Sequence, residues 1–556
     1  SQCHNFIVSM CNMRKIFLTN CFWLLLNVLH AATTGELNED IIVQLKEGKI
    51  RGHILKSENG NDYYAFQEIP YAAPPVGENR LQLPKKVQPW NGILDTTKNT
   101  RICYQMISKY SNLEIKEDCL YMNIYTPVKP GSNSRGLPVL LWIHGGGYTA
   151  ESSTFEYSSP KYIMDQGVVV VTFNYRLGPF GFTTTDDGVI PANIGLKDQR
   201  LALEWVSENI HLFAGDSNKI TIVGESAGSF SVGLHILGQS NEEKALFRAA
   251  IMQSGSPTEG IIQKNPRENA FSCGRVLNGN FSSNETSDLL KILQEASAEN
   301  FFQACSAASG TVIEKQGPFS YPPLQSFMDG NFKKIPILMG FNSEEWLYSA
   351  LDTNLTERAE IDDNPDELIT DLIHMSPENR TIAGQLLKKV YTNTSFQEDI
   401  GGFCRWFSDR MMINPICKQA ELISSEVPVY LYQFSYYGEL GQGPTEIIPG
   451  AGRVPHAADI HYMWEDVSNS DLSKFPEEDV LTLHRFVRMW TNFIKYLNPT
   501  PEKDPLLDNF LWPTTNSNNL LYFNFNDTLE VREYPRQYKN VKAILDNYMI
   551  PPYDYY

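Results

Sequence analysis

The stretch that most constrains this chain is residues 220–229, in which apolar and β-branched residues lead directly into Gly-Glu-Ser-Ala-Gly. A helix-compatible segment at 230–237 follows at once. A strand, a sharp turn and a helix in this order form a nucleophile elbow, the G-x-S-x-G pattern, which raises Ser226 above the end of a sheet. Glycine is needed on both sides because the two backbones approach closely there. A plain turn is the alternative, and the rest of the chain has to decide between them.

Unbroken apolar runs around the elbow predict a parallel sheet. Residues 138–143 and 167–174 are continuous apolar segments, which is typical of strands buried on both faces. Further strands are expected at 249–253, 335–340 and 429–435, and helices at 196–209 and 481–497. Strands that alternate with helices predict an α/β fold with a large, mostly parallel sheet flanked by helices. Long helical or irregular insertions are expected at 266–315 and 353–425.

The N-terminal residues have the pattern of a signal peptide. Arg14 and Lys15 precede an apolar run at 16–29 and small residues at 31–34. The run is too short, and too often interrupted by polar residues, to favour a membrane anchor. We therefore predict that residues 1–32 are the signal peptide with its preceding residues, that 33–556 form a single domain, and that the protein is secreted to the extracellular space without a membrane anchor.

Cysteines and glycosylation sequons agree with this compartment. After the predicted signal peptide, the cysteines fall as near pairs, namely Cys103 with Cys119, Cys273 with Cys305, and Cys404 with Cys417. An even number in local pairs predicts disulfides that close surface loops. Sequons predict glycosylation at some of Asn280, Asn284, Asn354, Asn379, Asn393 and Asn526.

Charge and metal-ligand spacing exclude several classes of partner. The net charge of −19 at pH 7, with no basic run to offset it, disfavours nucleic acid and anionic membranes. No Cys-x-x-Cys or Cys/His cluster has the spacing of a zinc site. We expect no metal.

A serine hydroxyl is a weak nucleophile near neutral pH, so Ser226 needs a base within hydrogen-bond reach. With this elbow the order along the chain is serine, acid, histidine. His456 and His461, in the loop after the predicted strand at 429–435, are the candidate bases, and the glycine-rich lead-in favours His456. The exit from the strand at 335–340 offers Glu344 and Glu345 as acids that could orient the imidazole. Both could equally be solvated loop carboxylates, and spacing alone does not choose between them.

The segment His-Gly-Gly-Gly at 144–147 follows the strand at 138–143. Consecutive glycines leave backbone N–H groups unobstructed, and such groups stabilise a developing oxyanion. The N–H of Ala227, directly after the serine, supplies another donor.

These motifs together resemble the type-B carboxylesterase and cholinesterase family of α/β-hydrolases. The resemblance extends over almost the whole mature chain, and the segments that carry it are 117–127, 142–148, 174–182, 193–199 and 213–228. It implies an α/β-hydrolase fold whose helical insertions form an active-site gorge. It also implies a serine carboxylesterase that hydrolyses a small-molecule or lipid-like ester to acid and alcohol through an acyl-enzyme, without a metal or organic cofactor.

The same resemblance assigns roles to individual residues. Ser226 matches the nucleophile, Glu345 the acid and His456 the base. The oxyanion donors match Gly146, Gly147 and Ala227. Cys103–Cys119 and Cys273–Cys305 look like two loop disulfides of the family, and Cys404–Cys417 is less general.

Several positions depart from the family pattern or discriminate within it. Trp346 stands where the family usually has glycine, and Arg453-Val454-Pro455 precedes the histidine in place of small residues. The first cysteine loop, 104–118, lacks the tryptophan with which cholinesterases hold choline. Glu225 stands where insect juvenile hormone esterases usually have glutamine, which favours a general secreted insect carboxylesterase. The alternatives are a juvenile hormone esterase, a lipase, and a non-enzymatic adhesion or binding ectodomain like the neuroligins.

Overall fold

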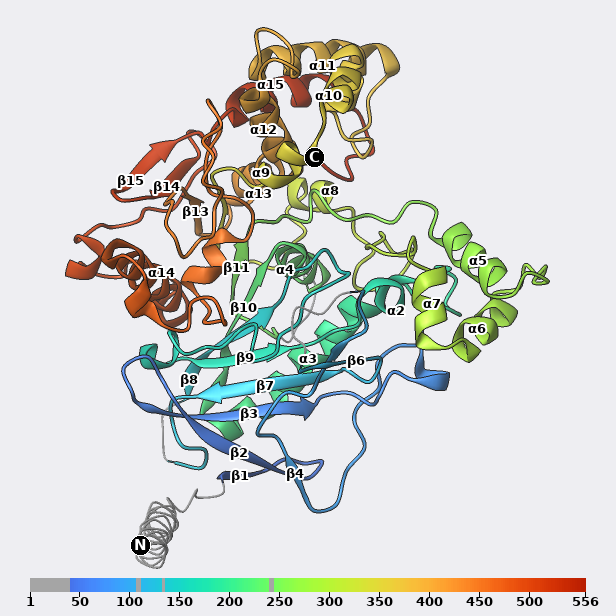
Figure 1. Ribbon diagram of the computed structural model, residues 1–556, viewed down its shortest axis with the longest axis vertical. Coiled ribbons are helices and arrows are strands. Elements are labelled where there is room, and N and C mark those ends of the chain that lie inside the picture. Colours follow the sequence, from blue (N-terminus) through green and yellow to red (C-terminus); the bar gives the residue numbers. More distant parts are fainter. Residues whose placement is uncertain (1–40, 107–111, 133–135, 240–244) are drawn as a thin grey trace, which may run out of the picture. The chain divides into compact units, whose positions relative to one another are not determined.

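A large sheet passes through the middle of the protein, and the predicted motifs follow the ends of its central strands (Figure 1). The computed structural model describes residues 41–106, 112–132, 136–239 and 245–556, so the predicted signal peptide at 1–32 lies outside it. Residues Ile42–Tyr556 form one compact unit. No helix in these described ranges is long and apolar enough to cross a membrane.

The strands of the described residues are β1 (Ile41–Gln44), β2 (Lys49–Lys56), β3 (Asp62–Pro70), β4 (Ile93–Asp95), β5 (Arg101–Cys103), β6 (Glu114–Lys116), β7 (Tyr121–Thr126), β8 (Leu137–Ile143), β9 (Val169–Phe173), β10 (Gly215–Glu225), β11 (Ala249–Gln253), β12 (Ile337–Asn342), β13 (Val429–Phe434), β14 (Leu521–Phe525) and β15 (Leu529–Glu533).

The helices are α2 (Gly178–Phe182), α3 (Ile194–Asn209), α4 (Ala227–Gly238), α5 (Pro266–Leu277), α6 (Thr286–Glu295), α7 (Ala298–Ala304), α8 (Pro323–Met328), α9 (Leu347–Asp352), α10 (Leu355–Asp363), α11 (Pro377–Tyr391), α12 (Ile400–Ser408), the π-helix η5 (Asp409–Ile413), α13 (Asn414–Ile423), α14 (Glu477–Tyr496) and α15 (Tyr538–Tyr548).

The main sheet has the strand order β1-β2-β3-β7-β9-β8-β10-β11-β12-β13-β14-β15, with β4 beside β2. All neighbours from β9 to β14 run parallel, whereas β2, β3, β7 and β15 pair antiparallel at the two sides. The predicted large, mostly parallel sheet with flanking helices is confirmed. The continuous apolar runs are explained by burial, since Val139, Leu141 and Ile222 are fully buried in the centre of the sheet.

Strand register determines which loops meet. Gly224 at the end of β10 is opposite Ile143 at the end of β8 and Met252 in β11. Gln253 at the end of β11 is opposite Gly340 in β12. Because parallel strands end at the same edge of the sheet, the residues that follow β8, β10, β11 and β12 are brought together there.

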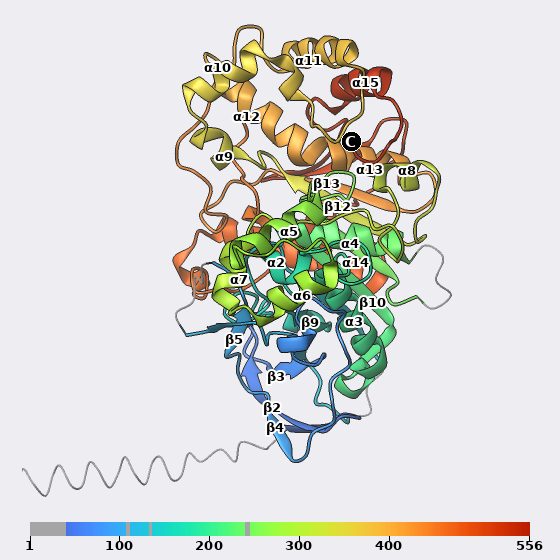
Figure 2. The ribbon, with the colours of Figure 1, turned by 90° about the vertical axis from the view of Figure 1, so that its right-hand side faces the viewer.

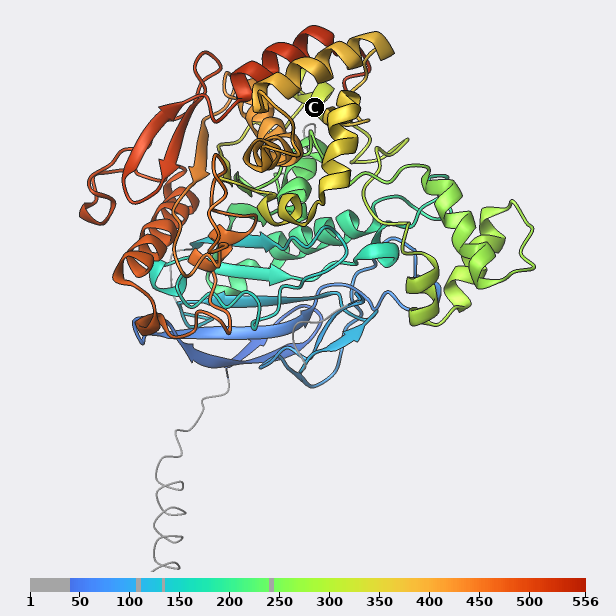
Figure 3. The same cartoon turned by 45° about the horizontal axis from the view of Figure 1, so that its top comes forward.

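Helical insertions are grouped at two places (Figures 1 and 2). Helices α5, α6 and α7 pack on one another beside the sheet, and α10, α11, α12 and α15 gather above β12 and β13. Figure 3 shows β14 and β15, coloured red, on the opposite side from α5–α7. The helix predicted at 481–497 is α14, and β14, β15 and α15 follow it.

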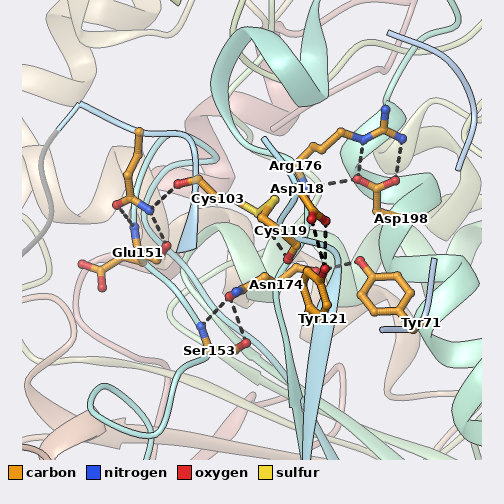
Figure 4. Close-up of a disulfide and its surroundings, with 11 residues drawn as sticks. Tyr71, Cys103, Asp118, Cys119, Tyr121, Glu151, Ser153, Asn174, Arg176 and Asp198 are labelled. Carbon is orange, nitrogen blue, oxygen red and sulfur yellow. Dashed lines mark hydrogen bonds and ion pairs between the residues drawn. A yellow bond between two sulfur atoms is a disulfide. The ribbon is translucent and has the colours of Figure 1, made fainter. Parts of the chain in front are cut away.

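One of the three predicted disulfides is present. Cys103 and Cys119 are joined, and the bond lies beside the strand end that carries Asn174 (Figure 4). Cys273 and Cys305 are free thiols, although they are buried in one apolar cluster and hydrogen-bond to each other, so the predicted bond is not formed in this structure.

The predicted Cys404–Cys417 disulfide is wrong. Both thiols are free, and the two residues lie in α12 and α13, which η5 joins into one uninterrupted helical stretch. At about 1.5 Å of rise per residue, their separation along the helix is on the order of 20 Å. A disulfide requires Cα atoms about 4.4–6.8 Å apart.

The predicted glycosylation sites differ in exposure. Asn280, Asn284, Asn354 and Asn393 are exposed, whereas Asn379 and Asn526 are half-buried. Glycosylation of any of these asparagines stays a prediction. The four exposed asparagines are the better candidates, because a glycan needs an accessible side chain.

Candidate active site

Ser226 lies at the turn between β10 and α4, with a φ of 54° and a ψ of −124°. A side chain rarely adopts this backbone conformation, so the surroundings must enforce it. A Cβ atom added at Gly228 would lie 2.0 Å from the carbonyl oxygen of Ile143, and one at Gly224 would lie 2.4 Å from the carbonyl carbon of Gly228. The two glycines are therefore required by close backbone approach, as the motif predicts.

The Ser226 side chain faces a cavity of about 330 Å³ at the edge of the sheet. His456, Gly146 and Gly147 line the same cavity. Much of the remaining wall is apolar and comes from Trp142, Phe230, Ile261, Trp346, Met411, Met412 and Ile460. The structure thus brings the predicted nucleophile, base and oxyanion glycines to one space.

His456 contacts Glu345 through its Nδ1 atom, which lies 2.6 Å from Oε2. The other carboxylate oxygen accepts hydrogen bonds from the Ser254 hydroxyl at 2.7 Å and from the Asn342 backbone N–H at 2.6 Å. The His456 backbone N–H also donates to the Glu345 carbonyl oxygen at 2.9 Å. The carboxylate is fully buried and fixed by several partners, so it can hold the imidazole in one orientation.

Glu344, the other candidate acid, is directed elsewhere. Its Oε1 atom lies 3.0 Å from Nη2 of Arg536, and its Oε2 accepts a hydrogen bond from the Gly452 N–H at 2.7 Å. His461, the other candidate base, has Nδ1 3.5 Å from Oδ2 of Asp466. Neither residue lines the cavity in the described part of the chain.

Polar side chains from three strands hydrogen-bond to the loop that carries His456. Asn342 donates through Nδ2 to the Pro455 carbonyl oxygen at 2.9 Å and to Asp459 at 3.1 Å. Asp459 also accepts hydrogen bonds from Gln253 and Tyr432. Burial raises the pKa of Asp459, although these hydrogen bonds oppose the effect. These hydrogen bonds connect β11, β12 and β13 to Pro455 and Asp459, which precede and follow His456 in the sequence.

Glu225 has a contact that the motif did not predict. Its Oε1 atom lies 3.2 Å from Nε2 of His456, so the imidazole has a carboxylate at each nitrogen. Burial raises the pKa of Glu225 to about 8, although the nearby His456 opposes this. Burial alone would lower the pKa of His456, but Glu225 and Glu345 outweigh it and raise the pKa to about 9.

In this arrangement the two carboxylates favour the protonated form of the His456 imidazole. The Ser226 hydroxyl has no hydrogen-bond partner among the described residues. Serine–histidine hydrogen bonds are often long or absent in ligand-free enzymes and form when substrate binds.

Two of the candidate oxyanion donors, Gly146 and Gly147, line the same cavity as Ser226, and the third, Ala227, directly follows the serine. Gly146 and Gly147 have φ values of 86° and 61°, and a Cβ at Gly146 would lie 2.3 Å from the Ala150 carbonyl oxygen. Their N–H groups donate to no acceptor in the ranges that the structure covers. Ala227 is the first residue of α4, where backbone N–H groups have no partner within the helix and the helix dipole is positive.

His144 stabilises this glycine loop without taking part in proton transfer. Its ring stacks on Tyr175 with centroids 4.5 Å apart, and the Tyr175 hydroxyl donates to the His144 carbonyl oxygen at 2.9 Å. Burial lowers the pKa of His144 to about 4, so the ring is neutral at physiological pH.

The loop closed by the Cys103–Cys119 disulfide hydrogen-bonds to a residue of the cavity wall. Gln105, two residues after Cys103, donates to the Glu151 carbonyl oxygen at 2.9 Å and accepts from the Glu151 N–H at 3.0 Å. Glu151 lines the cavity. The bonded cysteines therefore anchor one rim of the candidate site.

Trp346 lies beside the histidine, at the position where the family usually has glycine. Its ring stacks on His456 with centroids 5.7 Å apart and an angle of 9° between planes. Its backbone N–H donates to the Ser408 hydroxyl in α12 at 3.1 Å. The departure noted in the sequence thus places an aromatic wall against the base. Sequence reasoning missed Ser254, Met411 and Met412, because no motif indicates which strand end or insertion faces the cavity.

Comparisons with known proteins agree with this geometry. The family model described as the carboxylesterase family matches residues 39–542. Juvenile hormone esterase of Tribolium castaneum is 32% identical, over 83% of this chain and 84% of its own length. Venom carboxylesterase-6 of Apis mellifera is 32% identical over 85% and 87%, and acetylcholinesterase of Bungarus fasciatus is 30% identical over 88% and 83%.

The matches run through nearly the whole length of the described chain, including the elbow, the glycine loop and the histidine loop. The large, mostly parallel sheet flanked by helices agrees with an α/β-hydrolase fold. The chain therefore belongs to the carboxylesterase family of α/β-hydrolases, and it is a carboxylic ester hydrolase.

Proposed function

We propose that the protein hydrolyses carboxylic esters by acyl transfer through Ser226, with His456 as the base and Glu345 as the acid that orients it. The observation that carries the proposal is the 2.6 Å contact between His456 and Glu345 at the same cavity as the strained Ser226. A histidine oriented by a buried carboxylate is the partner that a serine nucleophile needs.

The reaction begins when Nε2 of His456, in its neutral form, exchanges its contact with Glu225 for the Ser226 hydroxyl. Ser226 Oγ attacks the ester carbonyl carbon while Nε2 takes its proton. The carbonyl oxygen becomes negatively charged and is stabilised by the N–H groups of Gly146, Gly147 and Ala227. The C–O bond to the alcohol then breaks, and the proton on Nε2 passes to the leaving oxygen.

Water completes the cycle. It gives a proton to Nε2 and attacks the acyl-enzyme carbonyl, after which the carboxylic acid leaves and Ser226 regains its proton. These steps use protein groups and water, and we propose that neither a metal nor an organic cofactor takes part. The apolar wall of the cavity suits a small-molecule or lipid-like ester.

The proposed substrate range is that of a general carboxylesterase. The similarity to a juvenile hormone esterase makes hormone hydrolysis the second candidate. A panel of p-nitrophenyl esters, juvenile hormone and acetylthiocholine, compared by kcat/KM, separates the two. A hormone specialist would prefer the hormone by orders of magnitude over short p-nitrophenyl esters.

We also propose that the protein is secreted. The Cys103–Cys119 disulfide supports an oxidising compartment, and the basic and apolar N-terminal pattern supports export. The venom carboxylesterase relative carries a name that agrees with this.

Substitution of the nucleophile tests the mechanism. Ser226→Ala removes Oγ without adding bulk, so we expect p-nitrophenyl acetate hydrolysis to fall by about 10⁴-fold or more. Circular dichroism and thermal unfolding should show an intact fold. Retention of most of the turnover by this variant would contradict the proposal.

A further inference from the structure

Glu259 is a buried carboxyl group in the cavity wall that the proposed mechanism does not use. It lies in the loop after β11, and its backbone N–H donates to the Ser256 carbonyl oxygen at 3.2 Å. The residue is only 6% exposed, yet it lines the cavity that contains Ser226. Its backbone is therefore held by the loop, and the residue forms part of the cavity wall.

One oxygen of this carboxyl is unsatisfied. The Gly260 backbone N–H hydrogen-bonds to the carboxyl, but Oε2 is buried without a hydrogen-bond partner among the described residues. Glu259 also forms no ion pair with any residue in that part of the chain. A buried polar atom without a partner costs free energy, so an atom left this way in a binding cavity indicates a partner that arrives with the ligand.

The surroundings of Glu259 are apolar and close to the reacting centre. Phe230 and Ile261 line the main cavity with it, and the same residues line a small adjoining cavity that continues toward Tyr148. The Cδ1 atom of Ile261 lies 3.7 Å from where a Cβ of Gly147 would be. The carboxyl thus lines both the main cavity and the small adjoining one, next to the apolar side chains of Phe230 and Ile261.

The protonation of Glu259 and the nearby charge of Arg410 determine which ligand group can hydrogen-bond to the carboxyl. Burial raises its pKa to about 8, against the opposing effect of Arg410, so the group is mostly a neutral acid at pH 7. A neutral carboxyl both donates and accepts hydrogen bonds. The positive charge of Arg410 disfavours a cationic ligand here, which leaves an uncharged oxygen function as the better match.

We propose that Glu259 forms a polar subsite that selects esters carrying an ether, carbonyl or hydroxyl oxygen in the chain on one side of the scissile bond. The proposal rests on the proposed function, because the ester must be positioned at Ser226 for the subsite to affect turnover. Glu259 acts through ground-state and transition-state binding of this oxygen, and it takes no part in proton transfer.

Matched esters test the subsite. Straight-chain p-nitrophenyl esters are compared with analogues in which one methylene is replaced by an ether oxygen, moved along the acyl chain. A second set moves the oxygen along the alcohol chain of acetate esters. We expect the wild-type protein to prefer an oxygen analogue at one position by about tenfold in kcat/KM, the effect of one hydrogen bond in a dry site.

Three variants assign this preference to the carboxyl. Glu259→Met has similar length without oxygens, and we expect the ratio of kcat/KM between the oxygen analogue and its all-carbon counterpart to fall to about one. Glu259→Gln keeps a donor and an acceptor and should retain most of the preference. Glu360→Leu, on the exposed face of α10, is the control for loss of a carboxylate and should behave as wild type.

The outcomes are distinguishable from failure of the mechanism. Absence of any oxygen preference in the wild-type protein, which needs no variant to fold, would overturn the subsite. A preference that survives in Glu259→Met would overturn it as well. In both cases Ser226→Ala would still be inactive if the proposed function is right, whereas turnover by Ser226→Ala would refute the function itself.

Discussion

The sheet edge and the helical insertion that lie on either side of the cavity are built in different ways. The sheet edge comprises the residues that follow β8, β10, β11 and β12, and it is rich in buried polar groups that hydrogen-bond to one another. The helical insertion comprises residues 347–423, from α9 to α13, and it contributes Met411 and Met412. One side presents reacting groups and the other presents apolar surface.

The two sides of the cavity meet two different requirements of an esterase, namely precise placement of the reacting atoms and a wall that fits the substrate. Reacting atoms must be held within a fraction of an ångström, which strand register and buried hydrogen bonds achieve. A substrate wall must match a particular shape, and flexible methionine side chains on a π-helix suit that purpose. We expect substitutions at the sheet edge to change rate and pH dependence, and substitutions facing the insertion to change substrate preference.

The largest effect after loss of the nucleophile is expected at Glu345. In Glu345→Gln the amide carries no negative charge to stabilise the imidazolium, and its NH2 group can donate to Nδ1 and select the wrong imidazole tautomer. We expect kcat/KM for p-nitrophenyl esters to fall by about 10³–10⁴-fold with little change in Tm.

Glu344→Gln is the matched control for this prediction. Glu344 pairs with Arg536 rather than with the histidine, so its substitution should act on the free energy of unfolding, by about 1–3 kcal/mol, with kcat changed far less. If the Glu344 variant loses activity and the Glu345 variant keeps it, the assignment of the acid is wrong.

An intermediate effect is expected at Glu225, and it concerns pH. Glu225, Glu345 and Asp459 are the carboxylates whose charge raises the pKa of His456. The neutral imidazole is the base, so kcat/KM of the wild-type protein should rise with pH toward the raised pKa of about 9. Removal of one anion destabilises the imidazolium and lowers that pKa.

In Glu225→Gln we therefore expect the acid limb of the pH profile to move to lower pH, on the order of one unit. The position of this limb is measured from kcat/KM between pH 5 and 10. Glu344→Gln is the control, in which we expect the acid limb to stay where it is in the wild-type protein. An unchanged limb, or one displaced to higher pH in Glu225→Gln, would show that the carboxylate does not act on the base.

The two regions also differ in how far the sequence predicts them. The elbow, the parallel sheet and the glycine loop follow from local rules, because glycine spacing and unbroken apolar strands have few structural solutions. The choice of Glu345 over Glu344 did not follow from spacing. It depends on which carboxylate the exit from β12 turns toward the histidine, and only the resemblance to the family indicated it.

The insertion was predicted only as a helical or irregular stretch. Helices α12 and α13 are amphipathic, but nothing in their periodicity states which turn faces the cavity. The π-helix that presents Met411 and Met412 has no local signal in the sequence. The same stretch explains the wrong disulfide. The twelve residues between Cys404 and Cys417 suggest a loop, whereas one uninterrupted helical stretch holds the two cysteines far apart. Glu225 was noted only as a difference from hormone esterases, since a carboxylate contact across the fold is not a local property.

The smallest effect is expected at Trp346, which contacts both regions. Its ring stacks on His456, and it packs against Phe407 of α12 with centroids 6.1 Å apart. Trp346→Gly should remove the wall beside the base and widen the cavity. Trp346→Phe keeps an aromatic ring and is the matched control.

For Trp346→Gly we expect kcat on p-nitrophenyl acetate to fall by about threefold to tenfold, because the imidazole loses a stacking partner worth on the order of 1 kcal/mol. The ratio of kcat/KM for branched over short linear esters should rise, since the added space admits bulkier chains. The phenylalanine variant should lie between wild type and glycine in both quantities. Equal ester ratios in all three proteins would mean that Trp346 does not affect the preference between branched and linear esters. The preference would then depend on the insertion, through Met411 and Met412.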